Sequence, residues 1–344
     1  MLNNSKEDKK GVWYSKHSGK LKVLTGIILS IIFLYLAGRN VEFRKIPDFI
    51  GRVNLFMYGL SLILYIFTLL LKSLQVKVML SPLGSAKTLG LLTSVSIGYY
   101  CNNILPLKAG EIVRSTLIAR KNSFSFWSVV SAMVLERSLD IVFILLIAFW
   151  VSFMVSLPHP VISSIRGFTV FSLLIFAIFI GIISRSEDTG RMRIFQKIIP
   201  INYRKSFEQW IQKFRNGLMS LKNLRNLFYT LFLGLCIWIA NMGVYWLRFK
   251  SMDLPCSAGV VGFFMVVVGL GVSIPSAPSY VGVFHFLTVY ALSVFGVGKN
   301  ESFSFAVFSH AIDFVVIAVV GNLALLIEGV SVLNYRKSMT GDIQ

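Results

Sequence analysis

Long apolar runs recur along this chain and constrain its fold more than any other feature of the sequence. A run of about 20 apolar residues can cross a hydrocarbon core of about 30 Å as a helix. Hydrophobic residues make up 55% of the 344 residues and charged residues 14%, whereas a typical soluble domain is about 25% charged. The sequence therefore predicts an all-α polytopic membrane protein, with about six full crossings at about 21–37, 54–71, 127–150, 162–183, 228–247 and 303–327.

The first run follows about 20 polar residues, which is too long for a usual secretory n-region, and no small-x-small cleavage site comes after it. We therefore expect residues 1–20 to be a basic cytoplasmic leader and the first run to be retained as an anchor. The transmembrane domain is expected over 21–335, with a cytoplasmic tail over 336–344. Three widely spaced cysteines predict neither a metal pair nor a disulfide framework, so no metal and no cofactor are expected.

Two further stretches, 84–107 and 258–297, are apolar but interrupted by proline, glycine, serine and asparagine. The loop 185–226 carries ten Lys or Arg against three acidic residues, a net charge of +7, and should be cytoplasmic by the positive-inside rule. It would fall outside if 84–107 crossed fully. We therefore expect 84–107 to be a re-entrant hairpin from the cytoplasm and 258–297 to be one from outside, with both termini cytoplasmic in the inner membrane.

The two halves of the chain, about 54–183 and 228–327, share a skeleton of proline, glycine and aspartate. The Pro-to-Gly gap is four in both halves, the Pro-to-Asp gap is 34 in one and 35 in the other, and each half contains Ser-Phe-Ser-Phe. With the topology above, this repeat is inverted, as in alternating-access carriers. The repeat predicts transport, and we expect hinges in the hairpins at Pro106, Gly110, Pro275, Pro278 and Gly282.

Charged residues inside apolar spans are the strongest candidates for function, because each costs at least about 2.5–3.5 kcal/mol near the bilayer centre. Glu136 and Asp140 share a helix face, and Arg137 can pair with Asp140. One interpretation is a structural cluster that neutralises itself. The other, favoured by the excess negative charge, is a substrate or proton site. His310 and Asp313 share a face of the last span and predict either a proton relay or a buried His–Asp hydrogen bond.

The end of the first broken stretch combines cations with amide groups, in a pattern that suits a phosphate or another anionic headgroup. Its residues are Asn102, Asn103, Lys108, Glu111 and Arg114, and we expect Lys108 and Arg114 where the chain regains the cytoplasmic interface. Two alternatives remain open. The cations can be interfacial anchors that snorkel, or Glu111 and Arg114 can pair with each other or with the charges of the span 127–150.

The net charge of +19 is concentrated between the apolar runs, which favours positive-inside topology and anionic lipids over nucleic acid as the partner. Lys72, Lys77 and Lys87 are expected on this cytoplasmic basic surface. In the linker 185–226, aromatic and aliphatic residues recur at helical spacing between basic ones, which predicts an amphipathic helix on the membrane. Docking of a lipid-modifying enzyme is the alternative for this linker.

The sequence resembles the transmembrane region of lysylphosphatidylglycerol synthases, a flippase-like membrane family, from about Leu21 to Leu333. The resemblance rests on Asn103-x2-Pro106-x3-Gly110-Glu111-x2-Arg114, on Glu136-Arg137-x2-Asp140, and on Pro275-x2-Pro278-x3-Gly282 followed by His285. It implies movement of a lipid between leaflets, such as an aminoacylated phospholipid or a lipid-linked glycan carrier, along a path lined by Glu111, Arg114, Glu136, Arg137 and Asp140. The aminoacyl-transferase domain of bifunctional relatives is not expected here.

The hypothesis from the sequence is a lipid flippase that moves an anionic or lipid-linked headgroup across the cytoplasmic membrane. Lys108 and Arg114 would capture the headgroup, and Glu136, Asp140, Asp313 and His310 would couple protons. A proton-coupled small-molecule carrier and a non-transporting scaffold for a glycosyltransferase are the alternatives. An enzyme is least favoured, because the spans offer no clear nucleophile–base pair or metal-ligand cluster.

Overall fold

The computed structural model describes residues 25–155, 162–163, 165–174, 223–272 and 277–329. These segments contain only helices and the turns between them, which confirms the all-α prediction for this part of the chain. Helices α3 (Leu55–Leu80), α10 (Leu224–Ser251) and α13 (Lys299–Ile327) are long and apolar enough to cross a membrane. They extend the predicted crossings at 54–71, 228–247 and 303–327 by several residues.

A sharp bend follows the helix of the first predicted crossing. The helix Thr25–Gly38 turns by 77° into the segment Phe43–Gly51, which contains a short 3-10 helix and α2 (Ile46–Gly51). Asn40 takes a left-handed conformation in this turn, with a φ of 64°, which asparagine tolerates better than most residues. Residues before 25 lie outside the described part of the chain, so the structure covers only the second part of this predicted span.

Helix α6 (Phe126–Met154) contains the predicted span 127–150 and has 29 residues, which gives a length of about 40 Å. Its central turns carry Glu136, Arg137 and Asp140. Of the next predicted span, 162–183, the structure describes an apolar helix over Ile165–Leu174. The linker that was predicted to be amphipathic falls almost entirely outside the described residues, as do the leader and the tail.

Both broken stretches form helical hairpins. The first consists of α4 (Thr88–Ile104) and α5 (Gly110–Asn122), which pack against each other and are separated by a 3-10 turn over Pro106–Lys108. The second consists of α11 (Ala258–Gly271) and α12 (Val283–Ser293), with a 3-10 turn over Pro278–Tyr280 before α12. These four helices have 17, 13, 14 and 11 residues, all fewer than the about 20 that a crossing needs.

The predicted boundaries of the first hairpin were wrong. The stretch 84–107 contains only its first helix, and the return helix α5 lies beyond it. Helix α5 contains charged residues, among them Glu111 and Arg114, so a search for apolar runs does not find it. The turn with Lys108 is therefore the tip between α4 and α5, whereas the sequence analysis placed Lys108 at the end of the hairpin. The two helices of the second hairpin lie within the predicted stretch 258–297.

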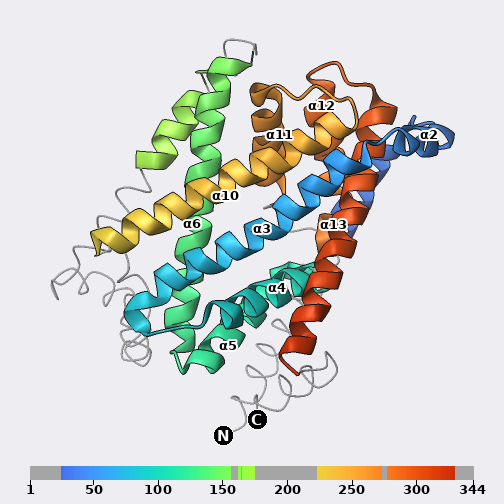
Figure 1. Cartoon of the computed structure of the whole chain (residues 1–344). Helices are drawn as coiled ribbons and strands as arrows, with labels where there is room; N and C mark the ends of the chain where they lie inside the picture. The colour runs from blue at the N-terminus through green and yellow to red at the C-terminus, as the bar shows by residue number, and fades with distance from the viewer. Residues whose placement is uncertain (1–24, 156–161, 164, 175–222, 273–276, 330–344) are drawn as a thin grey trace, which may run out of the picture.

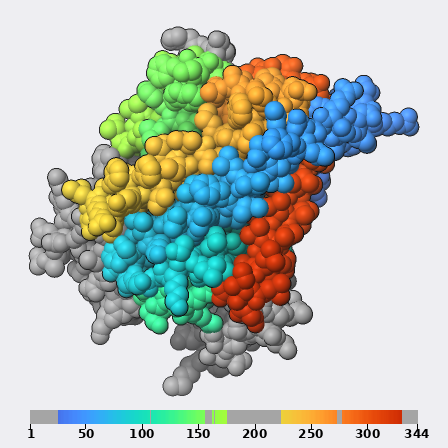
Figure 2. Space-filling model, in the orientation of Figure 1, coloured from blue at the N-terminus to red at the C-terminus, as the bar shows by residue number. Residues whose placement is uncertain are grey.

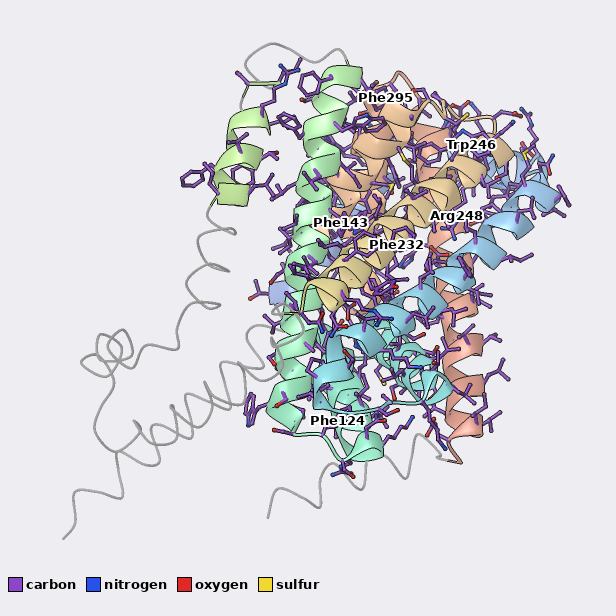
Figure 3. All side chains as sticks on the ribbon, turned by 60° about the vertical axis from the view of Figure 1, so that its left-hand side comes forward. Phe124, Phe143, Phe232, Trp246, Arg248 and Phe295 are labelled. Atoms are coloured by element: carbon purple, nitrogen blue, oxygen red, sulfur yellow. The ribbon has the colours of Figure 1, made fainter. Side chains whose placement is uncertain are left out.

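The two hairpins lie at opposite ends of the molecule. In Figure 1, α4 and α5 occupy the lower end, α11 and α12 the upper end, and α3 and α10 cross the middle. Figure 2 shows α3 and α10 as adjoining ridges on this face, in agreement with their extensive packing. Figure 3 shows Phe124, which follows α5, and Phe295, which follows α12, at the two ends. Helices α6 and α13 run along the length of the molecule between these ends (Figure 1).

Close backbone contacts fix the hairpins in place. A Cβ atom on Gly110, the first residue of α5, would lie 2.1 Å from the carbonyl oxygen of Gly98 on α4. A Cβ atom on Gly282, which has a φ of 85°, would lie 2.0 Å from the carbonyl oxygen of Ser30. Glycine is therefore required at both positions, by close approach at the first and by close approach and conformation at the second.

Candidate functional site

The tips of the two hairpins meet inside the molecule, although their helices extend to opposite ends. The ammonium group of Lys108 lies 5.5 Å from the ring centroid of Tyr280, and Ser279 Oγ lies 3.4 Å from Asn103 Oδ1. Lys108 lies two residues after Pro106, and Tyr280 lies two residues after Pro278. Both Lys108 and Tyr280 have a left-handed backbone conformation, with φ values of 56° and 60°. Two Pro-initiated turns of the same kind thus face each other.

A cavity of about 350 Å³ lies beside the tips, between them and helices α3, α6, α10 and α13. Polar and charged side chains share its lining with aromatic and aliphatic ones. The structure brings together here, from both halves of the chain, seven residues that the sequence analysis selected: Asn102, Asn103, Lys108, Glu111, Arg137, His310 and Asp313. Pro106, Gly110, Pro278 and Gly282 lie at or beside the tips, and Pro275 lies outside the described residues.

Three cations and three carboxylates form a continuous ion-pair network next to the cavity. Lys72 Nζ on α3 lies 2.8 Å from Asp140 Oδ1 and 3.2 Å from Glu136 Oε1 on α6. Arg114 Nη2 on α5 lies 2.5 Å from Glu136 Oε2 and 3.6 Å from Glu111 Oε2. Arg137 closes the network, because it pairs with Glu111 and, at 3.2 Å, with Asp140. The network ties α3, α5 and α6 together.

This network corrects two expectations. The excess negative charge predicted for α6 is balanced, because Lys72 and Arg114 reach it from other helices. Arg114 is 1% exposed and does not line the cavity, so in this conformation it is a buried structural partner of Glu136 and not a group open to a headgroup. The predicted pairs Arg137–Asp140 and Glu111–Arg114 are both present.

Lys72 and Arg248 are buried cations whose positions the sequence analysis did not predict. Lys72 was expected on the cytoplasmic basic surface, and Arg248 was not selected at all, but they are 6% and 1% exposed. Arg248 belongs to α10 and binds Asp313 of α13 through two hydrogen bonds of 2.6 and 2.8 Å, within 6 Å of the rings of Tyr58, Tyr65 and Tyr245. The sequence shows Arg248 as a charged residue near the end of an apolar run, which could have indicated a buried cation. It does not show that the partner is Asp313, 65 residues away.

The predicted hydrogen bond between His310 and Asp313 is wrong. Both side chains line the cavity, as expected from their spacing, but Asp313 pairs with Arg248, and His310 Nε2 lies 2.7 Å from the carbonyl oxygen of Ser279. The ring of His310 also lies 5.0 Å from that of His285 on α12. His310 therefore connects the last helix to the tip of the second hairpin.

The other end of α13 is attached to the first hairpin. Lys121 Nζ at the end of α5 lies 2.6 Å from Glu328 Oε1, which also accepts a hydrogen bond of 2.5 Å from Thr93 Oγ1. Partial burial acts to raise the pKa of Glu328, but the hydrogen bonds from Lys121 and Thr93 outweigh it and hold the pKa of this carboxyl below its usual value. In the described part of the chain, no group of three His, Cys, Asp or Glu residues could hold a metal ion.

Long apolar helices, buried ion pairs and two proline-broken hairpins define an integral multi-pass membrane protein. The model of the Lysylphosphatidylglycerol synthase TM region family matches residues 23–321, and the chain belongs to this family. It is also similar to a UPF0104 membrane protein of Methanocaldococcus jannaschii, with 25% identity over 244 residues, which cover 70% of this chain and 98% of that protein. No solved structure matches the chain.

Proposed function

We propose that this protein is a translocase that moves an anionic lipid between the leaflets of the cytoplasmic membrane and has no catalytic activity of its own. One observation carries the proposal: a cavity with charged and polar groups in its lining, walled by both hairpin tips, adjoins an apolar pocket on α13. Phe314 lines both the cavity and this pocket, which has a volume of about 380 Å³. A lipid has the same two parts, a polar headgroup joined to apolar chains.

Lys108 is the anion-binding group that the proposal assigns to the cavity. The six-membered network is neutral, and Arg248 neutralises Asp313. Among the described residues, Lys108 has no carboxylate within ion-pair distance; it is exposed, and its ammonium group lies over the ring of Tyr280. A phosphodiester would compensate this charge, with Asn102 and Asn103 beside it as hydrogen-bonding groups.

The size of the cavity supports a binding mode in which the headgroup lies in the cavity and the acyl chains lie outside it. A volume of about 350 Å³ is near the lower end of the range for small-molecule pockets, about 300–1,000 Å³, and suits a headgroup without its chains. The pocket on α13 leads through Leu323 to a second apolar pocket of about 450 Å³ between α3, α4 and α13. This surface gives the chains a path that stays in contact with the bilayer.

We further propose that the two hairpins are re-entrant and belong to an inverted repeat, with both termini in the cytoplasm. The order of helices supports it: α3, α4, α5 and α6 in one half correspond to α10, α11, α12 and α13 in the other. In each half, a basic residue of the first helix pairs with the aspartate of the last, as Lys72–Asp140 and Arg248–Asp313. The opposed hairpins in Figure 1 fit the same scheme.

In this mechanism the ion pairs can exchange partners when the hairpins move. The cation of the network that reaches the cavity is Arg137, and not Arg114 as the sequence analysis expected. The side chain of Arg137 is 42% exposed, so it can contact a headgroup while it is held by Glu111 and Asp140. His310 contacts the second tip directly and remains the candidate for proton coupling.

Reconstitution in vesicles tests the proposal. Protein-containing and protein-free vesicles would receive fluorescent phosphatidylglycerol, and the fraction open to a membrane-impermeant quencher would be followed over time. We expect the label to exchange between leaflets faster with protein than without it. The proposed function is contradicted if phosphatidylglycerol and every other anionic lipid tested exchange between leaflets no faster in protein-containing vesicles than in protein-free vesicles.

A further inference from the structure

We propose that the headgroup accepted by the cavity is a phosphate that carries a ring with several hydroxyl groups, such as a sugar or a cyclitol, and that headgroups with an ammonium group are rejected. This inference rests on the proposed function and names its class of substrate. It is carried by three independent properties of the cavity lining: its aromatic rings, its buried polar atoms without partners, and its balance of charge.

Five aromatic side chains with polar groups line the cavity, from four different parts of the chain: Tyr65, Tyr99, Trp238, Tyr245 and Tyr280. A sugar ring presents flat faces of C–H groups and an edge of hydroxyl groups. Aromatic rings bury such faces, and their O–H and N–H groups can bond the edge. A glycerol headgroup is short and flexible and has no such face. The aromatic lining therefore favours a cyclic polyol.

Three polar atoms of lining residues are buried without a hydrogen-bond partner in the described part of the chain. Glu111 Oε2 is one of them and has the charge of Arg114 at 3.6 Å; the other two are Asn102 Oδ1, an acceptor on α4, and Trp238 Nε1, a donor on α10. Buried polar atoms are nearly always paired, because an unpaired one loses its bonds to water without compensation. Neither atom has exposed surface, so a ligand reaches them only when the two side chains turn toward the cavity; a hydroxyl group can then donate to Asn102 Oδ1 and accept from Trp238 Nε1. A ligand with several hydroxyl groups would satisfy both.

The balance of charge separates this class from cationic headgroups. Both carboxylates that line the cavity are already paired, Glu111 with Arg137 and Asp313 with Arg248. An ammonium group would find no free carboxylate in the lining and would lie close to Lys108 and Arg137. Aromatic rings can bind cations, but three of the five rings already have one: Tyr280 has Lys108 at 5.5 Å, and Tyr65 and Tyr245 have Arg248 at 5.6 and 5.7 Å. One negative charge, as on a phosphodiester, neutralises the site.

Competition binding to the full-length protein in detergent micelles tests this inference. Fluorescent phosphatidylglycerol would be displaced by phosphatidylinositol, by a prenyl-phosphate glucose, by unlabelled phosphatidylglycerol, and by lysyl-phosphatidylglycerol. We expect the better of the two ring-bearing lipids to compete about tenfold more strongly than phosphatidylglycerol, and lysyl-phosphatidylglycerol to be the weakest. The inference is overturned if neither ring-bearing lipid exceeds phosphatidylglycerol, or if the lysyl lipid competes best.

Two substitutions locate the preference in the cavity. Trp238→Phe keeps an aromatic ring but removes the N–H donor, and Asn102→Ala removes the buried acceptor. We expect each to reduce the preference for the ring by several fold, while thermal unfolding in the same micelles, unchanged from the unmodified protein, shows that the variants are folded. Trp246→Phe on the outer surface of α10 and Asn226→Ala are matched controls that should keep the preference. An unchanged preference in Trp238→Phe and Asn102→Ala would refute the assigned site.

Soluble competitors separate this inference from the proposed function. If inositol 1-phosphate and glucose 1-phosphate compete as well as the lipids with the same headgroups, the preference for a ring-bearing phosphate is supported. The conclusion that a lipid supplies this group is then not supported. If the ring-bearing lipids bind best but are not moved in vesicles, the substrate class stands and translocation fails. If phosphatidylglycerol is moved and no lipid with a ring is preferred, translocation stands and the present inference fails.

Discussion

Arg248 on α10 and Asp313 on α13 form a two-point ion pair: Arg248 Nη1 lies 2.8 Å from Asp313 Oδ2, and Nη2 lies 2.6 Å from Oδ1. The fork of the guanidinium group matches the two carboxylate oxygens, so this pair fixes the orientation of α10 against α13 as well as their distance. Figure 3 labels Arg248 on α10, between the ends marked by Phe124 and Phe295.

The pair predicts a difference between single and double substitutions. Arg248→Met should lower the free energy of unfolding by about 3–5 kcal/mol, because Asp313 would keep a charge with no partner. Arg248→Met combined with Asp313→Leu should cost less than Arg248→Met alone. Unfolding in mixed micelles of mild detergent and dodecyl sulfate measures both. Arg225→Met, at an exposed position of the same helix, is the control, and a double variant less stable than both single variants would oppose this account.

Glu136→Gln tests the ion-pair network. Glu136 is 0% exposed and contacts both Lys72 and Arg114, so the neutral amide should leave two buried cations poorly compensated. We expect a loss of stability of about 3–5 kcal/mol in the same unfolding measurement. Glu301→Gln, at an exposed site, should change stability by less than about 1 kcal/mol. Equal stability of Glu136→Gln and the unmodified protein would mean that the network does not stabilise the fold.

Local patterns in the sequence predicted local structure well. Apolar runs located α3, α10 and α13 because burial in a bilayer demands uninterrupted hydrophobicity, and the i, i+3 spacing correctly predicted the Arg137–Asp140 pair. Proline and asparagine marked the break between α4 and α5, although the sequence analysis placed this break at the end of the hairpin and not at its tip.

Long-range pairing could not be predicted in the same way. Lys72 and Arg248 resemble interfacial residues in the sequence, because their partners lie 68 and 65 residues away. Helix α5 was missed for the same reason: its charges are compensated by residues of other helices, so it is buried without being apolar. Only the three-dimensional arrangement distinguishes these buried cations from cations at the surface, such as those of the basic surface to which Lys72 was assigned.

Gly282→Ala should disturb the second hairpin. Its Cβ atom would collide with the carbonyl oxygen of Ser30, and its φ of 85° is unfavourable for alanine. We expect a loss of about 1–3 kcal/mol in unfolding free energy. Gly59→Ala on α3 is the matched control, because a Cβ atom there meets nothing within 4 Å and alanine favours the helix by about 0.5–1 kcal/mol. Similar stabilities of the two variants would show that the hairpin tolerates movement away from the first helix.

Cysteine labelling tests the opposed orientation of the hairpins. Single cysteines at Ser125, after the first hairpin, and Ser293, at the end of the second, would be introduced after replacement of Cys101, Cys236 and Cys256. Both serines are exposed. In intact cells, an impermeant maleimide should label Ser293→Cys and should label Ser125→Cys only after lysis. Labelling of both from the same side would rule out an inverted repeat.

The most direct test of lipid translocation compares Lys108→Met with Lys250→Met in reconstituted vesicles. Lys250 is an exposed cation near the end of α10, remote from the cavity lining, so its loss should leave transport unchanged. We predict that the unmodified protein and Lys250→Met exchange fluorescent phosphatidylglycerol between leaflets at the same rate, and that Lys108→Met slows this exchange about tenfold or more. Equal rates for the folded Lys108→Met variant and the unmodified protein, or no exchange above protein-free vesicles by any of them, would contradict the account.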